Sequence, residues 1–148
     1  MASTSLYLNF KGQTEEAFNY YKTVFNTEFA APFMRFGDVP PQPGHDAPPL
    51  SDADKNGVMH VSLPILGGTI IMGSDALESM GQVLTDGNNV TISLEADTKV
   101  ETDRLYNALA EGGSDLAPMR DEFWGYWGCC KDRFGVRWMF NFPNQQPQ

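Results

Sequence analysis

Basic residues are scarce in this sequence. Its 148 residues include 10 Lys and Arg against 19 Asp and Glu, which gives a formal net charge of −9. A surface that binds DNA or RNA needs clustered Lys and Arg to displace phosphate counterions, and the basic residues here form no run. An anionic membrane surface requires a similar cluster. We therefore expect neither nucleic acid nor a membrane among the partners.

Cysteine is also scarce, because Cys129 and Cys130 are the only two. A disulfide between sequence neighbours would need a strained ring, and no second pair supports a redox or metal role. The first ten residues contain neither a basic leader nor an apolar stretch with a cleavage site, and no segment is long and apolar enough to span a membrane. These features predict free thiols and a cytoplasmic location.

What the sequence does contain is an internal repeat of a strand followed by a helix. In residues 5–10, apolar and polar side chains alternate as they do in a half-buried strand. A helix is predicted to follow over Thr14–Phe25, with Thr14 as its N-terminal cap and Asn26 at its C-terminal end. Residues 90–96 repeat the strand, and Thr98 opens a second predicted helix. Three predicted strands follow each helix: residues 28–36, 58–65 and 69–74 in the first half, and residues 115–119, 123–131 and 136–142 in the second.

The two halves differ by one Pro-rich insertion. The predicted helices begin at Thr14 and Thr98, which are 84 positions apart, whereas the turn glycines Gly68 and Gly135 are 67 positions apart. The first half is therefore 17 residues longer between its helix and its turn glycine. This difference matches a stretch rich in proline and aspartate within residues 39–57. Prolines disfavour regular structure, so the insertion is either a disordered surface excursion or a substrate lid. We predict one α+β domain over residues 1–148, made of two βαβββ units at about 1–80 and 86–143.

Strand alternation predicts which side chains line a cleft between the units, because the more apolar side of each strand should pack on a helix. Met72 and Met139 occupy equivalent positions, four residues after the two turn glycines. Val90, Ile92 and Leu94 are expected in the core. The other side chains predicted to face the cleft are Tyr7, Asn9, Val58, His60, Ser62, Thr91, Ser93, Glu95, Arg137 and Asn141.

The most aromatic stretch covers residues 123–128 (FWGYWG). Alternation turns either Trp124 and Tyr126 or Phe123 and Trp127 toward the cleft, and we favour Trp124. Aromatic side chains on a cleft wall suit flat apolar ligands, while core packing or a dimer interface would use the same residues.

Several of these segments together resemble the glyoxalase/bleomycin-resistance/extradiol dioxygenase superfamily, also called vicinal oxygen chelate proteins, in its PhnB-like (3-demethylubiquinone methyltransferase-like) branch. The segments are residues 7–10 (YLNF), 15–21 (EEAFNYY), 59–61 (MHV), 72–75 (MGSD), 123–125 (FWG) and 132–138 (DRFGVRW). The resemblance implies a cupped eight-stranded mixed β barrel with two flanking helices, a small-molecule cleft and a homodimer.

The resemblance also implies where a metal would sit, because metal-dependent superfamily members place His, Gln or Glu on the first and last strands of each unit. Here the last-strand positions are Met72 and Met139, and thioethers bind hard or borderline divalent ions poorly. The first strands supply no His or Glu at the equivalent positions. The candidates there are Ser5, Leu6 or Tyr7 in the first unit and Val90 or Thr91 in the second. His60 lies on a different strand and has Glu95 as its one candidate co-ligand, and His45 lies in the insertion. We predict no metal and no cofactor.

Three functions follow from these features. The first is a metal-free small-molecule-binding protein of the bleomycin-resistance kind, whose cleft residues are Tyr7, His60, Met72, Thr91, Trp124, Arg137 and Met139. The second is an enzyme of the lyase, dioxygenase or transferase type, in which His60 is the acid/base for a small carbonyl or phenolic substrate and Arg137 holds an anionic group. The third is a dimeric interaction module. The sequence does not support a methyltransferase function, because no strand is followed by a Gly-rich turn of the kind that binds a nucleotide cofactor.

Overall fold

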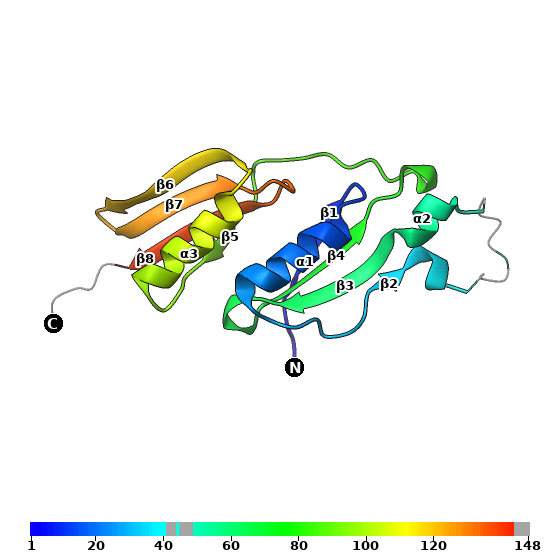
Figure 1. The fold of residues 1–148 in the computed structure, drawn as a ribbon, viewed down its shortest axis with the longest axis horizontal. Coiled ribbons are helices and arrows are strands. Elements are labelled where there is room, and N and C mark those ends of the chain that lie inside the picture. Colours follow the sequence, from blue (N-terminus) through cyan, green and yellow to red (C-terminus); the bar gives the residue numbers. More distant parts are fainter. Residues whose placement is uncertain (41–43, 45–48, 144–148) are drawn as a thin grey trace. The chain divides into compact units, whose positions relative to one another are not determined.

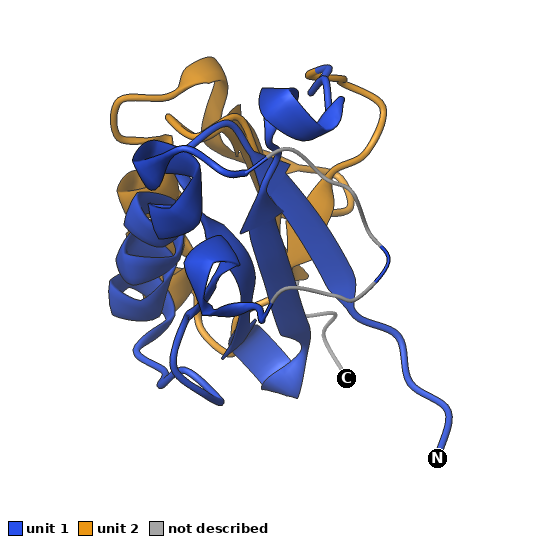
Figure 2. Cartoon of the chain, turned by 90° about the vertical axis from the view of Figure 1, so that its right-hand side faces the viewer, with its two compact units in different colours: residues 1–85 blue, residues 86–148 orange. Residues whose placement is uncertain are grey.

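The chain folds as two compact units in the computed structural model, which describes residues 1–40, 44 and 49–143. Unit 1 covers residues 1–85 and unit 2 covers residues 86–148 (Figure 2). The boundary falls within the stretch that the repeat leaves between its two halves. Among the described residues, no helix has the length and apolar character needed to cross a membrane.

Unit 1 is a four-stranded mixed sheet with one long helix on it (Figure 1). Its elements in chain order are β1 (Leu6–Phe10), α1 (Thr14–Phe25), β2 (Met34–Arg35), η1 (Phe36–Asp38), α2 (Asp52–Asn56), β3 (Val58–Pro64), η2 (Leu66–Gly68), β4 (Ile70–Asp75) and η3 (Glu78–Met80). The sheet order is β1-β4-β3-β2, with β1 parallel to β4 and the other neighbours antiparallel.

Unit 2 repeats this arrangement (Figure 1). It contains β5 (Ile92–Leu94), α3 (Lys99–Ala110), β6 (Ser114–Glu122), β7 (Gly125–Lys131) and β8 (Arg137–Pro143). The order β5-β8-β7-β6 matches that of unit 1, and β5 is again parallel to its neighbour. The α+β class and the twofold βαβββ repeat are therefore confirmed. Within the described residues, the strands form two four-stranded sheets, one in each unit.

Each long helix packs on one face of its sheet, but the two units fill this interface in different ways. In unit 1 the bulky side chain comes from the helix: Phe18 lies edge-on to Phe10 and directly over Gly73 of β4. In unit 2 the strand supplies it, because Phe140 of β8 is fully buried against Tyr106 of α3. The expectation that one face of each sheet is apolar and covered by a helix is confirmed.

Several predicted boundaries were wrong. The strand over residues 28–36 shrinks to β2, and β5 begins only at Ile92, so Val90 is exposed instead of buried. The insertion over residues 39–57 is not wholly irregular, because α2 forms after its last proline, with the Ser51 hydroxyl accepting a hydrogen bond from the Asp54 N–H. Residues 41–43 and 45–48, including His45, lie outside the described residues.

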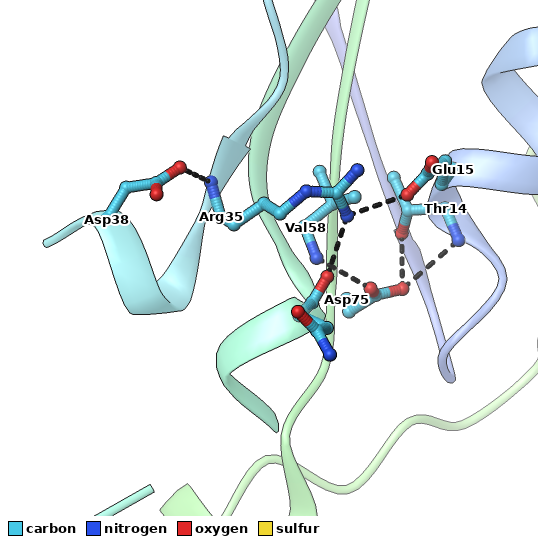
Figure 3. Close-up of polar contacts among 7 residues, drawn as sticks. Thr14, Glu15, Arg35, Asp38, Val58 and Asp75 are labelled. Carbon is cyan, nitrogen blue, oxygen red and sulfur yellow. Dashed lines mark hydrogen bonds and ion pairs between the residues drawn. The ribbon is translucent and has the colours of Figure 1, made fainter. Parts of the chain in front are cut away.

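The start of α1 is held by a carboxylate from far along the chain, not by Thr14 acting as a cap. Gln13 occupies the cap position, and Thr14 is the first helical residue. Asp75, at the end of β4, accepts hydrogen bonds at Oδ1 from the Thr14 N–H (3.1 Å) and hydroxyl (2.7 Å), and at Oδ2 from the Val58 N–H (2.8 Å) (Figure 3). Buried Asp75 thus joins α1, β3 and β4 at one point.

Arg35 links the same corner to the end of the insertion (Figure 3). Its Nη1 lies 2.7 Å from Oε2 of Glu15 and donates to the carbonyl of Asn56 at 2.8 Å. Its backbone N–H donates to Asp38 Oδ2 at 3.0 Å. The hydrogen bond from Arg35 lowers the pKa of the Glu15 carboxyl below its ordinary value. The predicted helix end is confirmed, since Asn26 adopts the left-handed conformation there.

Candidate functional site

The sheet face of unit 1 opposite α1 carries polar and soft side chains, and we call it the helix-free face of unit 1. Met72 on β4 lies at its centre, with Tyr7 of β1 on one side and Ser62 of β3 on the other in the strand register. The His60 ring lies 6.0 Å from the Tyr7 ring, centroid to centroid. Val58, which was expected here, is buried, and its N–H donates to Asp75.

The helix-free face of unit 2 is built on the same register. Met139 on β8 lies between Ser93 of β5 and Cys129 of β7. Lys131 pairs with Arg137 at one end of the face, and Trp127 pairs with Asn141 at the other. Alternate residues of each strand share a face, so these seven side chains lie together.

The register settles which residues are equivalent in the two units. Met72 and Met139 both lie on the central strand that pairs with the first strand of the unit, as the turn glycines predicted. Among the first-strand candidates, Tyr7 is the neighbour of Met72. In unit 2 the neighbour of Met139 is Ser93, because Val90 and Thr91 precede β5 and are exposed.

A divalent metal does not fit these positions. The four side chains are a phenol, a hydroxyl and two thioethers, none of which is a good ligand for a hard or borderline divalent ion. Within residues 1–40, 44 and 49–143, no group of three or more His, Cys, Asp or Glu side chains is arranged to hold a metal ion. Glu95 is exposed just beyond β5.

His60, the proposed acid/base, belongs to unit 1, and Arg137, the proposed anion-holding residue, belongs to unit 2. Arg137 has a partner within unit 2, because its Nη1 lies 3.0 Å from Oδ2 of Asp115 in an ion pair. Their joint action in catalysis stays a prediction.

The aromatic stretch contributes Trp127, not Tyr126, to the helix-free face. Tyr126 points toward α3, where its hydroxyl donates to Asp103 Oδ1 at 2.6 Å, and this hydrogen bond raises the pKa of the Tyr126 phenol to about 12. Trp124 lies in the turn before β7, is 45% exposed and packs edge-on to Trp127 at 6.2 Å. The alternation argument did not apply to Trp124, because the strand begins only at Gly125.

The two cysteines are free and differ in their surroundings. Cys130 is buried on the side of α3, and burial raises the pKa of its thiol to about 12, which keeps it protonated and unreactive. Cys129 is half-buried on the helix-free face beside Met139. It therefore belongs to the candidate site as a soft, apolar contact.

Sequence reasoning missed Lys131 and Cys129 as parts of this face and left Trp127 as one of two alternatives. Alternation alone could have found all three, because they lie two residues apart along β7. The preference for Trp124 over Phe123 and Trp127 hid this pattern, because that choice turns Cys129 and Lys131 to the opposite face.

Comparison with known proteins shows the family of this chain. Residues 2–140 match the family described as 3-demethylubiquinone-9 3-methyltransferase. The chain belongs to this family. It is 31% identical to Protein YjdN of Escherichia coli over 147 residues, with 97% of each chain covered. A solved structure of protein PA1353 from Pseudomonas aeruginosa is 34% identical, with a TM-score of 0.79 over 97% of this chain and 98% of that one.

More distant structures share the fold alone. A PhnB protein from Bacillus cereus aligns with a TM-score of 0.72 at 22% identity, over 95% of this chain and 99% of that one. A glyoxylase/bleomycin resistance protein/dioxygenase domain from Frankia aligns with a TM-score of 0.63 at 10% identity, over 97% and 98% of the two chains. These two likenesses show that the chain has the glyoxalase-like fold.

Proposed function

We propose that this chain is a metal-free small-molecule-binding protein, with its ligand held on the helix-free face of a sheet. The observation that carries the proposal is the pair of methionines, Met72 and Met139, at the centres of the two equivalent registers. A thioether is a flexible, polarisable surface for an apolar or aromatic ligand and a poor ligand for divalent ions.

The neighbours of these methionines support binding of an amphipathic molecule. Tyr7 and His60 present adjacent rings beside Met72, and Trp127 lies two residues from Cys129 on the strand beside Met139. Such a mixture of aromatic, sulfur and hydroxyl groups is typical of sites that hold small organic ligands. The name of the matching family would suggest methyl transfer, but the sequence has no Gly-rich turn of the kind that binds a nucleotide cofactor after a strand. Our proposal therefore includes no cofactor.

A ligand screen followed by thermal unfolding tests this function. Small aromatics, sugars, thiols, antibiotics and divalent ions are added to chelator-treated protein, and we expect at least one organic compound to raise Tm in a concentration-dependent way. For that compound, Tyr7→Ala or Met139→Ala should weaken binding, whereas Val100→Ala, on the exposed side of α3, should not. A screen in which no organic compound raises Tm would contradict the proposal.

We also propose that the chain forms a homodimer and works in the cytoplasm. Supporting the dimer, the turn before β7 exposes Phe123, at 91%, next to Trp124. Supporting the cytoplasm, both thiols are free. Light scattering of the purified chain decides the oligomeric state, and fractionation of the source cells decides the location.

A further inference from the structure

Two cations face each other across neighbouring strands of unit 2. Lys131 of β7 and Arg137 of β8 are direct register partners on the helix-free face. Their side chains are mostly buried, at 23% and 21% exposure. Like charges placed directly opposite each other destabilise a sheet, so the fold itself gives no reason for this pair.

The repeat supplies an internal comparison. The equivalent pair in unit 1 is Pro64 of β3 opposite Ile70 of β4, both apolar and at the same place relative to the central methionine. The same backbone register therefore forms without any charge at this position. The cations of unit 2 are an addition to the scaffold and not a requirement of it.

The carboxylates that accompany these cations leave them partly unneutralised. Asp86 lies 4.0 Å from the Lys131 Nζ, the outer limit of an ion pair, and Asp115 pairs with Arg137 through Nη1 only. The side chains of Asp86 and Asp115 are 64% and 60% exposed, far more than those of the cations. Solvent therefore screens the attraction between each carboxylate and its cation. Within the described residues, Nε and Nη2 of Arg137 are left to donate to another carboxylate in the fork geometry that guanidinium groups favour.

The rest of the face suits an aromatic ring. On the helix-free face, the register pair next to the two cations is Cys129 with Met139, and the next pair on that face is Trp127 with Asn141. Trp127 is itself flanked by Arg120, whose guanidinium lies 5.5 Å from its ring, and by Trp124. At a rise of roughly 3.3 Å per residue, the face extends about 13 Å from Arg137 to Asn141, the length of a two-ring aromatic acid with room for its carboxylate.

We propose that the helix-free face of unit 2 binds flat aromatic carboxylates. The carboxylate lies between Lys131 and Arg137, and the ring packs on Met139 and Cys129 toward Trp127. This inference rests on the proposed small-molecule function and names the ligand class for it. The helix-free face of unit 1, with Pro64 and Ile70 in place of the cations, holds no second such subsite.

Calorimetry with a matched pair of probes tests the assignment. Naphthoate and its neutral analogue naphthamide have the same shape, and we expect naphthoate to bind at least about tenfold more tightly. Arg137→Gln and Lys131→Gln should each weaken naphthoate binding by about tenfold and leave naphthamide binding unchanged. The matched control is Arg104→Gln, which removes a cation that pairs with Glu101 on α3, and it should alter neither affinity.

The outcomes separate this inference from the proposed function. Equal binding of the two probes, or a preference that survives both substitutions, overturns it, and if Arg137→Gln does not fold, Lys131→Gln decides alone. A screen that finds other binders while naphthoate does not bind overturns the aromatic-carboxylate subsite and leaves the small-molecule function standing. A screen with no binder, together with no binding of either probe, overturns both.

Discussion

Replacing Asp75 by Ala should lower the free energy of unfolding by about 3–5 kcal/mol, a large part of the total for a chain of this size. The substitution leaves the Thr14 N–H, the Thr14 hydroxyl and the Val58 N–H without their shared acceptor in a buried corner. Each buried donor without a partner costs roughly 1–3 kcal/mol, and the first turn of α1 also loses a favourable negative charge. Chemical denaturation measures the change.

The control for Asp75 is Glu16→Ala, because Glu16 is an exposed acid in the same first turn of α1. It removes a charge that favours the helix dipole but no buried hydrogen bond, so a loss of under about 1 kcal/mol is expected. If the two variants lose similar stability, Asp75 acts only through its charge, and the hydrogen-bonded corner described above is not what fastens α1 to the sheet.

Gly73→Val should destabilise the protein by about 3 kcal/mol, because α1 lies too close to β4 for a side chain there. A Cβ at Gly73 would lie 2.6 Å from Cε2 of Phe18 and 3.0 Å from the Leu8 carbonyl oxygen. Overpacking of this kind usually costs roughly 1–3 kcal/mol for each site, and valine adds two methyl groups beyond the Cβ. Ser74→Val, on the opposite face of the same strand, should change stability by under about 0.5 kcal/mol.

A double variant shows whether Phe18 is the cause. Phe18→Ala alone should cost about 3–5 kcal/mol through the cavity it leaves. Combined with Gly73→Val, the total loss should be smaller than the sum of the two single losses by about 1–2 kcal/mol, because valine fills part of the vacated space. If the two single losses of stability simply add, the valine at position 73 does not clash with Phe18, and other residues of unit 1 move to make room for it.

The repeat could be predicted from the sequence because the signals for its helices and turns lie within short segments of the chain. The bounds of α1 follow from helical spacing and Asn26, and the turn glycines correctly placed Met72 and Met139 at equivalent registers. The helix-facing sides of β1 and β8, and of β3 apart from Val58, follow from alternation in the same way. The side chains of β4 are too uniformly apolar for alternation to decide, and the turn glycines placed Met72 instead.

The remaining features depend on contacts that no local pattern records. Asp75 holds Thr14 from 61 positions away, so its role in starting α1 was not visible in the residues near that helix. β7 begins at Gly125, which has a φ of 155° and follows the turn at Phe123 and Trp124. Alternation along β7 left two sets of side chains to choose between, and the register placed Trp127, Cys129 and Lys131 on the helix-free face.

The central claim is that this chain binds its ligand without a metal, and elemental analysis tests it most directly. Protein purified without chelators should contain well under one divalent ion per chain, and adding Zn²⁺, Ni²⁺ or Mn²⁺ should neither raise Tm nor change the affinity for an organic ligand found by the screen. About one divalent ion per chain, whose removal abolishes ligand binding and whose return restores it, would contradict the claim.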